Sequence, residues 1–316
     1  MKPITRVLIA GMGLAATAWG WGDTGHMVVA RIAAQNLTPE TRARVAALLA
    51  LVNDDVPTVA DGMAAASVWA DHFARPHFPR SSPWHYIDLS LLNGEHDPGQ
   101  PFVQTDTSFY KILQYAAALQ TGSPDEFGVP GANLMFLIHF TGDLHQPLHD
   151  ATNQDRGGNC VFVKYPKQNG RLSRKQNLHS AWDTGLLEDN LGTNDAWIAA
   201  QLQSGYAANS STDQQDVLLA DPARVGVPTA VYAWTMEAHQ LAIDRVYAPL
   251  GPDVPVLSYA DVSSDCDNAA PFTNQLYFVD QDYVNSSVQT IDRQLTAGGV
   301  RLAALLNATF SPAAQR

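Results

Sequence analysis

The chain has 316 residues, with 19 Lys and Arg against 31 Asp and Glu and a formal net charge of −12. With 46% hydrophobic and only 16% charged residues, it is too apolar and too weakly charged for a disordered protein. The acidic balance excludes a protein that binds nucleic acid through a general basic patch, because such binding needs clustered Lys and Arg. A nucleic-acid substrate held by bound metal ions stays open.

The first twenty residues have the pattern of a secretory signal peptide. Lys2 and Arg6 form a positive start, residues 7–18 are an apolar run too short for a membrane span, and small residues follow. Signal peptides are usually cleaved after two small residues separated by any one residue. Ala16-Thr17-Ala18 before Trp19 and Ala18-Trp19-Gly20 before Trp21 both fit, and the general signal-peptide pattern prefers cleavage before Trp19. No other stretch approaches the ~18 uninterrupted apolar residues of a membrane span. The mature chain is therefore expected to be secreted or periplasmic, with no membrane association.

Helical periodicity dominates the rest of the chain. Helices are predicted over residues 25–36, 39–51, 64–73, 108–120, 133–144, 178–187, 229–246 and 288–306. Residues 160–165 alternate like a strand and predict a short β-hairpin with residues near Leu172. Residues 76–83, 93–101 and 204–222 are expected to be loops because they are rich in Gly, Pro, Ser and Asp. Since no composition break marks a linker, residues 21–316 are predicted to form one mostly α-helical domain.

The two cysteines, Cys160 and Cys266, lie far apart in the sequence. In an exported chain an even pair suggests one disulfide that closes a long loop, and two buried free thiols are the alternative. Neither cysteine has the CxxC spacing of a zinc site, so any metal must be held by nitrogen and oxygen.

Two histidine–aspartate pairs have the spacing of metal ligands. His139 and Asp143 are four residues apart on one predicted helix, and His179 and Asp183 repeat that spacing on another. Both side chains of such a pair leave the same helix face. His149 follows a proline break, where the chain can turn back toward the same cavity. Imidazole and carboxylate without thiolate form the ligand set of a hydrolytic zinc site, and burying these carboxylates without a cation would be costly.

Six motifs occur in the order in which one protein family carries them. They are Trp21-Gly22-Asp23-Thr24-Gly25-His26, Trp69-Ala70-Asp71, Trp84-His85-Tyr86-Ile87-Asp88, HFTGDLHQPLH at 139–149, Asp155-Arg156-Gly157-Gly158-Asn159 and Asn177-Leu178-His179-Ser180-Ala181-Trp182-Asp183. Together they resemble the S1/P1 nuclease family of secreted zinc nucleases. Beyond Asp183 the chain resembles the family only in its predicted helical periodicity. It implies an all-α fold of the phospholipase C/P1 nuclease type, with three Zn²⁺ ions in one cleft.

The resemblance also implies the metal ligands, position by position. One zinc would lie among Asp71, His85, His139 and Asp143, a second among His149, His179 and Asp183, and a third among His26, Asp143 and the amino nitrogen and carbonyl oxygen of Trp21. Trp21 would then be the first residue of the mature chain, despite the generic preference for Trp19. An α-amino group has a pKa near 8, so a metal displaces its proton easily.

The implied activity is that of an endonuclease that hydrolyses single-stranded DNA and RNA to 5′-phosphate products, with 3′-nucleotidase activity on nucleotides. Catalysis would be by metal ions, with Asp71 orienting the attacking water. Base binding maps to Tyr86, which would stack on a base, and to Asp88, which would accept hydrogen bonds from its edge. Asn159 would border the cleft. No stable protein partner is expected, and the protein is expected to be a monomer.

One position departs from the family pattern. The family usually places an arginine three residues after the aspartate of the Trp-Ala-Asp motif, where it clamps the phosphate. Here that position is Ala74, and arginine follows one residue later as Arg75. Either a bulge moves Arg75 into place or the clamp is missing.

Two other functions stay open. A zinc-dependent phospholipase C shares the fold and almost all the ligands, but that branch typically has glutamate where this chain has Asp183, and Asp88 suits a base better than a choline headgroup. A non-catalytic secreted zinc protein would have its metal sites closed by protein ligands. His145 lies within the strongest motif but six residues from His139, so we expect it to pack or to support a ligand rather than to bind metal.

Overall fold

A computed structural model of the chain describes residues 21–53, 55, 57–92, 100–251, 266 and 276–311. The expected signal peptide lies outside these residues. The fold is mostly helical, as predicted. The α-helices are α1 (Asp23–Gln35), α2 (Pro39–Leu49), α3 (Val59–Ser67), α4 (Arg75–His77), α5 (Gln100–Val103), α6 (Ser108–Thr121), α7 (Ala132–Asp143), α8 (Leu178–Ser180), α9 (Leu186–Leu191), α10 (Asp195–Ala208), α11 (Ser211–Leu218), α12 (Pro222–Val225), α13 (Val227–Leu241) and α14 (Gln281–Thr309).

Shorter elements of other geometry interrupt these helices. The 3₁₀-helices are η2 (Pro79–His85), η3 (Glu126–Gly128), η4 (Pro147–Asp150) and η7 (Ala248–Leu250), and the π-helices are η1 (Ala70–Ala74), η5 (Ala181–Gly185) and η6 (Ala242–Tyr247). A π-helix carries one residue more per turn than the α-helix around it, so it shifts the face that later residues occupy. The sequence predicted continuous helices through η5 and over all but the last residue of η1 and η6.

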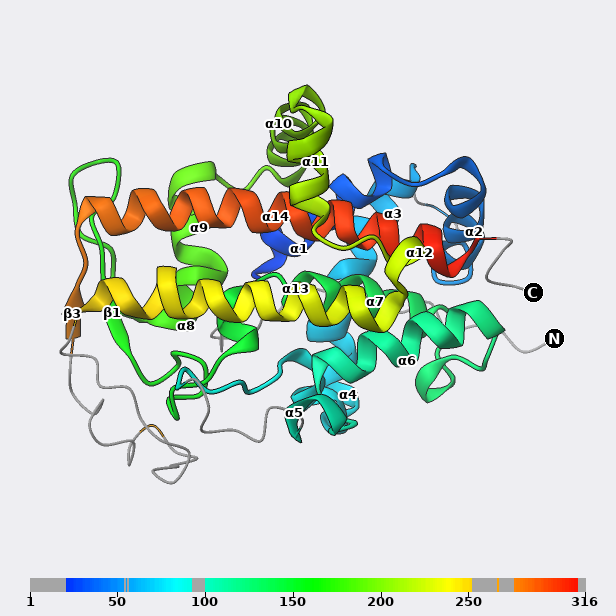
Figure 1. The fold of residues 1–316 in the computed structure, drawn as a ribbon, viewed down its shortest axis with the longest axis horizontal. Coiled ribbons are helices and arrows are strands. Elements are labelled where there is room, and N and C mark those ends of the chain that lie inside the picture. The colour runs from blue at the N-terminus through cyan, green and yellow to red at the C-terminus, as the bar shows by residue number, and fades with distance from the viewer. Residues whose placement is uncertain are drawn as a thin grey trace.

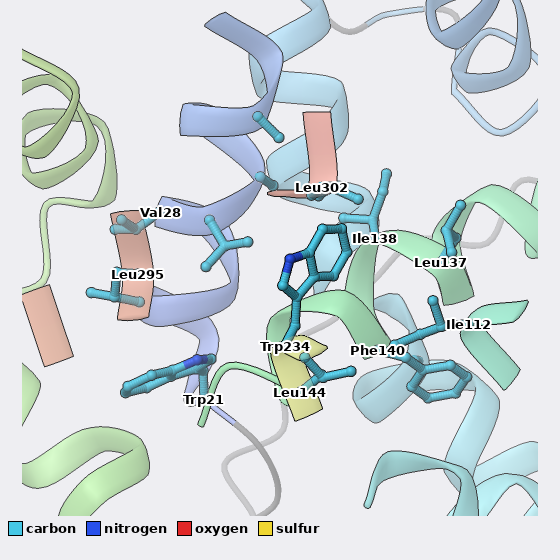
Figure 2. Packing of buried hydrophobic residues seen from close by; sticks show 14 of the residues in the cluster. Trp21, Val28, Ile112, Leu137, Ile138, Phe140, Leu144, Trp234, Leu295 and Leu302 are labelled. Atoms are coloured by element: carbon cyan, nitrogen blue, oxygen red, sulfur yellow. The ribbon is translucent and has the colours of Figure 1, made fainter. Parts of the chain in front are cut away.

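The two long helices α13 and α14 run across the molecule in opposite directions, with α6 and α7 on one side and α10 and α11 on the other (Figure 1). Helix α1 packs against α3, α7, α10 and α14, and α6 packs against α7. The apolar faces of these helices meet in one core, which includes Val28, Ile138, Trp234 and Leu295 (Figure 2). Among the described residues, no helix is both long and apolar enough to cross a bilayer.

Polar caps begin several helices where the sequence places them. The side chain of Thr38 accepts a hydrogen bond from the backbone nitrogen of Thr41 and begins α2, as predicted. The expectation of a loop over 204–222 is wrong, because α10 extends to Ala208 and α11 begins at Ser211. The polar residues between them act as caps: the Ser210 hydroxyl accepts from the Asp213 nitrogen at 3.2 Å. The residue types that suggested a loop instead separate two helices.

A small three-stranded sheet lies at one end of the molecule, in the order β2-β1-β3. Strand β1 (Phe162–Lys164) pairs antiparallel with β2 (Gln176–Asn177), and Pro166 bridges Leu172, which confirms the hairpin. Strand β3 (Leu276–Phe278) adds in parallel to β1 and was not expected. The predicted disulfide is confirmed: Cys160, two residues before β1, is bonded to Cys266.

Candidate metal centre

Helix α7 places the first histidine–aspartate pair inside the protein. His139 and Asp143 are both 0% exposed, and the Nε2 atom of His139 lies 3.2 Å from Oδ2 of Asp143. Every residue of α7 is buried, so both side chains are removed from bulk water. The four-residue spacing therefore does what the sequence predicted and directs two potential ligands to one point.

The second pair is built differently. His179 belongs to α8 and Asp183 to the π-helix η5, yet His179 Nε2 lies 3.5 Å from Asp183 Oδ2. Asp71 also lies on a π-helix, η1. π-helical turns occur frequently at functional sites because the extra residue redirects a side chain. Two of the carboxylates implied as metal ligands are thus held by turns that periodicity alone does not reveal.

All eight side chains implied as metal ligands gather in three groups, two of which share His139. The groups are His26, His139 and Asp143; Asp71, His85 and His139; and His149, His179 and Asp183, each with its candidate ligand atoms within 4.8 Å of one another. Asp143 connects the groups, because its carboxylate lies 3.3 Å from His26 Nε2, 3.1 Å from His85 Nδ1 and 3.7 Å from His149 Nδ1. The described residues thus hold a continuous buried cluster of imidazoles and carboxylates.

Backbone carbonyls fix the orientation of three of these imidazoles. The Nδ1 atoms of His139, His149 and His179 each lie 2.6 Å from a carbonyl oxygen, those of Ser67, His85 and Gly157 respectively. Each Nδ1 therefore donates its proton outward and leaves the Nε2 lone pair facing the cluster. This arrangement, in which an outer acceptor fixes the tautomer, is typical of metal-ligating histidines.

Two of these lone pairs face each other. The Nε2 atoms of His149 and His179 are 3.1 Å apart. Burial, followed by the nearby imidazole of His149, lowers the pKa of His179 to about 3, and burial also lowers that of His149. Both rings are therefore neutral near pH 7, with no proton to place between them. A cation at this point would remove the repulsion between the two nitrogens.

The carboxylate of Asp183 completes this set. Burial raises its pKa well above the usual range, although Gln146 Nε2 donates to its Oδ1 at 2.5 Å. The other oxygen, Oδ2, is buried and has no hydrogen-bond partner among the residues that the structure describes. Such an oxygen beside two imidazole nitrogens fits a divalent cation such as zinc, which is bound by carboxylate oxygens and imidazole nitrogens.

His26 reaches the cluster through a close approach of two helices. Both of its ring nitrogens are buried, and neither has a hydrogen-bond partner among the described residues. A Cβ atom at Gly142 would lie 2.7 Å from His26 Nδ1, so α7 must have glycine there for α1 to bring the ring in. Trp21, at the start of this segment, is 0% exposed. Its role as an amino-terminal ligand stays a prediction.

Comparison with known proteins agrees with this geometry. The family described as S1/P1 Nuclease matches residues 21–311. The chain belongs to the S1/P1 nuclease family. It is 29% identical to Endonuclease 4 of Arabidopsis thaliana over 92% of this chain and 89% of the relative. It is also 26% identical to Nuclease P1 of Penicillium citrinum over 91% of this chain and 97% of the relative.

In this S1/P1 family member, the displaced arginine follows directly after the π-helix η1. Ala74, at the position where the family has arginine, is buried, and Arg75 lies four residues after Asp71. Arg75 Nη1 lies 3.5 Å from Asp71 Oδ1. A π-helical turn is present before Arg75. That Arg75 takes the place of the family's phosphate clamp stays a prediction and is part of the proposal below.

The residues implied in base binding lie beside the metal centre. Tyr86, next to His85, is 37% exposed, and its carbonyl accepts from the Ser108 nitrogen at the start of α6. Although Asp88 is also exposed, desolvation by the protein around it and the nearby Asp155 raise its pKa to about 6. The side-chain amide of Asn159 is already engaged, since its Nδ2 donates to the Arg156 carbonyl at 2.8 Å.

Sequence reasoning missed the residues that hold the outer side of this S1/P1 site. His145 lies outside the three metal groups, as expected, but its ring nitrogens contact Thr141 O at 2.7 Å and Arg301 Nη1 at 3.2 Å. Arg301 lies on α14, 156 residues away. Similarly, His239 of α13 contacts the Asp150 carbonyl at 2.8 Å, directly after His149. No local pattern in one sequence could have paired residues so far apart.

Proposed function

We propose that this protein is a zinc-dependent phosphodiesterase that hydrolyses single-stranded DNA and RNA. The observation that carries the proposal is the pair of Nε2 lone pairs of His149 and His179 facing each other at 3.1 Å beside the unpaired Oδ2 of Asp183. Nitrogen and oxygen donors without thiolate suit a catalytic rather than a closed structural zinc site. Bound zinc supplies Lewis-acid chemistry, which neutralises phosphate charge and lowers the pKa of water.

Three zinc ions would occupy the three groups. Asp71, His85, His139 and Asp143 would hold one ion; His149, His179 and Asp183 would hold the second; and His26, Asp143 and the amino group and carbonyl of Trp21 would hold the third. The third set requires Trp21 to be the mature amino terminus. The contacts of the Asp143 carboxylate with His26, His85 and His139 support a shared cluster rather than separate sites.

The protein's own side chains would orient the attacking water, bind the phosphate and bind the base. Asp71 has a side chain that is 19% exposed, so it can meet a substrate at the edge of the cluster, and we assign it the orientation of the attacking water. Arg75, 3.5 Å from Asp71, would bind a non-bridging oxygen of the scissile phosphate. Tyr86 would stack on the base and Asp88 would accept from its edge, which suits an unpaired strand.

The finer assignments follow from this placement. A leaving 3′ oxygen on the side of His149, His179 and Asp183 would give 5′-phosphate products, and 3′-nucleotidase activity on nucleotides follows from the same geometry. The disulfide between Cys160 and Cys266 favours an oxidising compartment outside the cytosol. We therefore propose a secreted or periplasmic monomer.

The decisive experiment uses the protein purified from a host that exports it. Metal analysis and amino-terminal sequencing should give three zinc ions per chain and Trp21 as the first residue. Heat-denatured DNA and RNA should be cleaved to 5′-phosphate ends, and phosphatidylcholine should not. Turnover of phosphatidylcholine without nucleic-acid cleavage would establish a phospholipase C instead, and zinc without any phosphodiester hydrolysis would establish a non-catalytic protein.

A further inference from the structure

The turn Gln154–Gly158 has an unusual backbone and lies against the metal centre. Gln154, Arg156, Gly157 and Gly158 have φ angles of 58°, 59°, 60° and 82°, in the left-handed region. Two of these four residues are not glycine, and each such residue costs roughly 1 kcal/mol or more. A conformation of this kind persists only where the surrounding structure fixes it.

The buried carboxylate of Asp155 fixes this turn. Its Oδ1 accepts from the backbone nitrogens of Asn153 at 3.2 Å and Gly158 at 3.0 Å, and its Oδ2 accepts from the Tyr247 hydroxyl at 2.8 Å. Asp155 is 0% exposed. These hydrogen bonds hold the backbone of the turn in one conformation, so they also fix the position from which the neighbouring Arg156 side chain extends.

The turn is joined to the metal centre through its backbone. The Gly157 carbonyl oxygen lies 2.6 Å from Nδ1 of His179. A Cβ atom at Gly157 would lie 2.6 Å from the carbonyl oxygen of Leu148, which precedes His149. Arg156 therefore stands one residue from a carbonyl that contacts His179, in a turn that packs closely against the residue before His149.

Arg156 is exposed, and its guanidinium makes no hydrogen bond or ion pair with the described residues. Its charge is nevertheless close to the base site. Desolvation raises the pKa of the Tyr86 hydroxyl, and the guanidinium groups of Arg75 and Arg156 both oppose this rise. Arg75 lies 3.5 Å from Asp71, whereas Arg156 belongs to the separate turn whose Gly157 carbonyl contacts His179.

We propose that Arg156 forms a second phosphate subsite, which binds the non-scissile phosphate on the 5′ side of the nucleotide whose base lies on Tyr86. This inference rests on the proposed function, because it takes the scissile phosphate to be at the metal centre. With the base on Tyr86 and the scissile phosphate on the 3′ side at the metal centre, the other phosphate of that nucleotide is the 5′ one. Arg156 stands on a turn joined to the metal centre, and its charge acts on the Tyr86 hydroxyl. A guanidinium on a rigid turn is well suited to phosphate oxygens.

The test compares the dinucleotide ApA with pApA, which differs only by the added 5′-phosphate. With the zinc-loaded wild type, pApA should have a KM about fivefold lower than ApA at similar kcat. In the variant Arg156→Gln the two KM values should become equal, while the KM for ApA stays within about twofold of wild type. Arg156→Lys should recover part of the preference for pApA.

Arg224→Gln is the matched control, because it removes one exposed positive charge from α12, outside the site. It should keep the full preference for pApA, which separates a specific contact from an effect of net charge. Equal KM values in the wild type, or an unchanged preference in Arg156→Gln, would overturn the subsite.

A binding measurement keeps this inference separate from the proposed function. If neither dinucleotide is cleaved, the nuclease proposal fails. Calorimetric titration of the zinc-loaded protein with adenosine and with adenosine 5′-monophosphate then still tests Arg156. The subsite predicts tighter binding of the monophosphate in the wild type and no difference in Arg156→Gln; the same difference in both proteins would reject it.

Discussion

Arg301 and His145 contact each other in the interior of the protein, with Arg301 Nη1 3.2 Å from His145 Nε2. Both residues are 0% exposed. Arg301 Nη1 also lies 2.6 Å from Glu237 of α13, and His145 Nδ1 lies 2.7 Å from the Thr141 carbonyl of α7. Burial and the charge of Arg301 lower the pKa of His145 to about 3, so the ring is neutral and can accept from Arg301 while donating to Thr141. Two distant helices thus fix the last turn of α7, which carries Asp143.

The variant Arg301→Met should lose stability and bind zinc less tightly. Breaking a buried pair by removing one partner typically costs about 3 kcal/mol or more, and His145 would also lose its donor. Chemical denaturation and competition with a zinc chelator measure the two effects. Arg293→Met is the matched control, because Arg293 pairs with the same Glu237 at 3.2 Å but does not contact His145. Equal zinc affinity in both variants would show that the contact with His145 does not support the metal centre.

The variant Asp71→Asn should abolish turnover and retain most of the zinc. The amide keeps one oxygen for the metal but cannot take a proton or orient water as a carboxylate does, so kcat should fall by about 100-fold or more. Metal analysis and steady-state kinetics on the same preparation give both results. Full activity in this variant would remove Asp71 from its assigned role.

Substrate affinity should depend on the ionisation of Asp88, whose pKa is raised to about 6. Above that pH the carboxylate accepts hydrogen bonds from a base, and as pH falls through about 6 it becomes protonated and the acceptor is lost. KM should therefore rise as pH falls from 8 to 5. Zinc binding also depends on pH, but it should do so equally in the wild type and in Asp88→Asn. The ratio of the two KM values at each pH therefore isolates the effect of Asp88. A ratio that does not change with pH would contradict this role.

The variant Asp292→Asn should stabilise the protein, and more at pH 8 than at pH 5. Burial raises the pKa of Asp292 on α14 to about 6, and its Oδ1 has no hydrogen-bond partner. The pKa of Asp292 is higher in the folded protein than in the unfolded chain, so folding disfavours the charged carboxylate. The free energy of unfolding therefore falls as pH rises from the unfolded pKa to about 6, and it stays low above pH 6. After allowance for partial exposure, the gain should grow by roughly 1 kcal/mol from pH 5 to pH 8. Asp216→Asn, at an exposed position of α11, should show no such trend in denaturation.

Affinity for single-stranded substrates should fall only shallowly with salt. Two arginines near the base site, Arg75 and Arg156, are the cations proposed to contact phosphate. Each contact on a single strand contributes a slope of about −0.7 in log affinity against log salt, so the expected slope is about −1.4. Titration of an oligonucleotide at several salt concentrations gives this slope. A much steeper value would reveal a basic groove that the described residues do not contain.

The helices could be predicted because their signals are local. Residues 108–120 and 133–144 were expected as helices, and α6 and α7 match them within a residue or so at each end. The boundaries near 70 and 181 were predicted incorrectly, because a π-helix differs from an α-helix by one residue and leaves no mark in periodicity. The parallel strand β3 was missed because its partner β1 lies more than a hundred residues earlier.

The sequence alone determined the chemical identity of this protein: which imidazoles and carboxylates are available, their four-residue spacing on two helices and the six motifs that resemble the S1/P1 nucleases. Those features depend only on neighbours along the chain. Only the tertiary structure decided that the eight side chains share one buried cluster, that Arg75 reaches Asp71 and that Arg301 supports His145. These contacts join residues far apart in sequence, and their geometry depends on how whole helices pack rather than on any local preference.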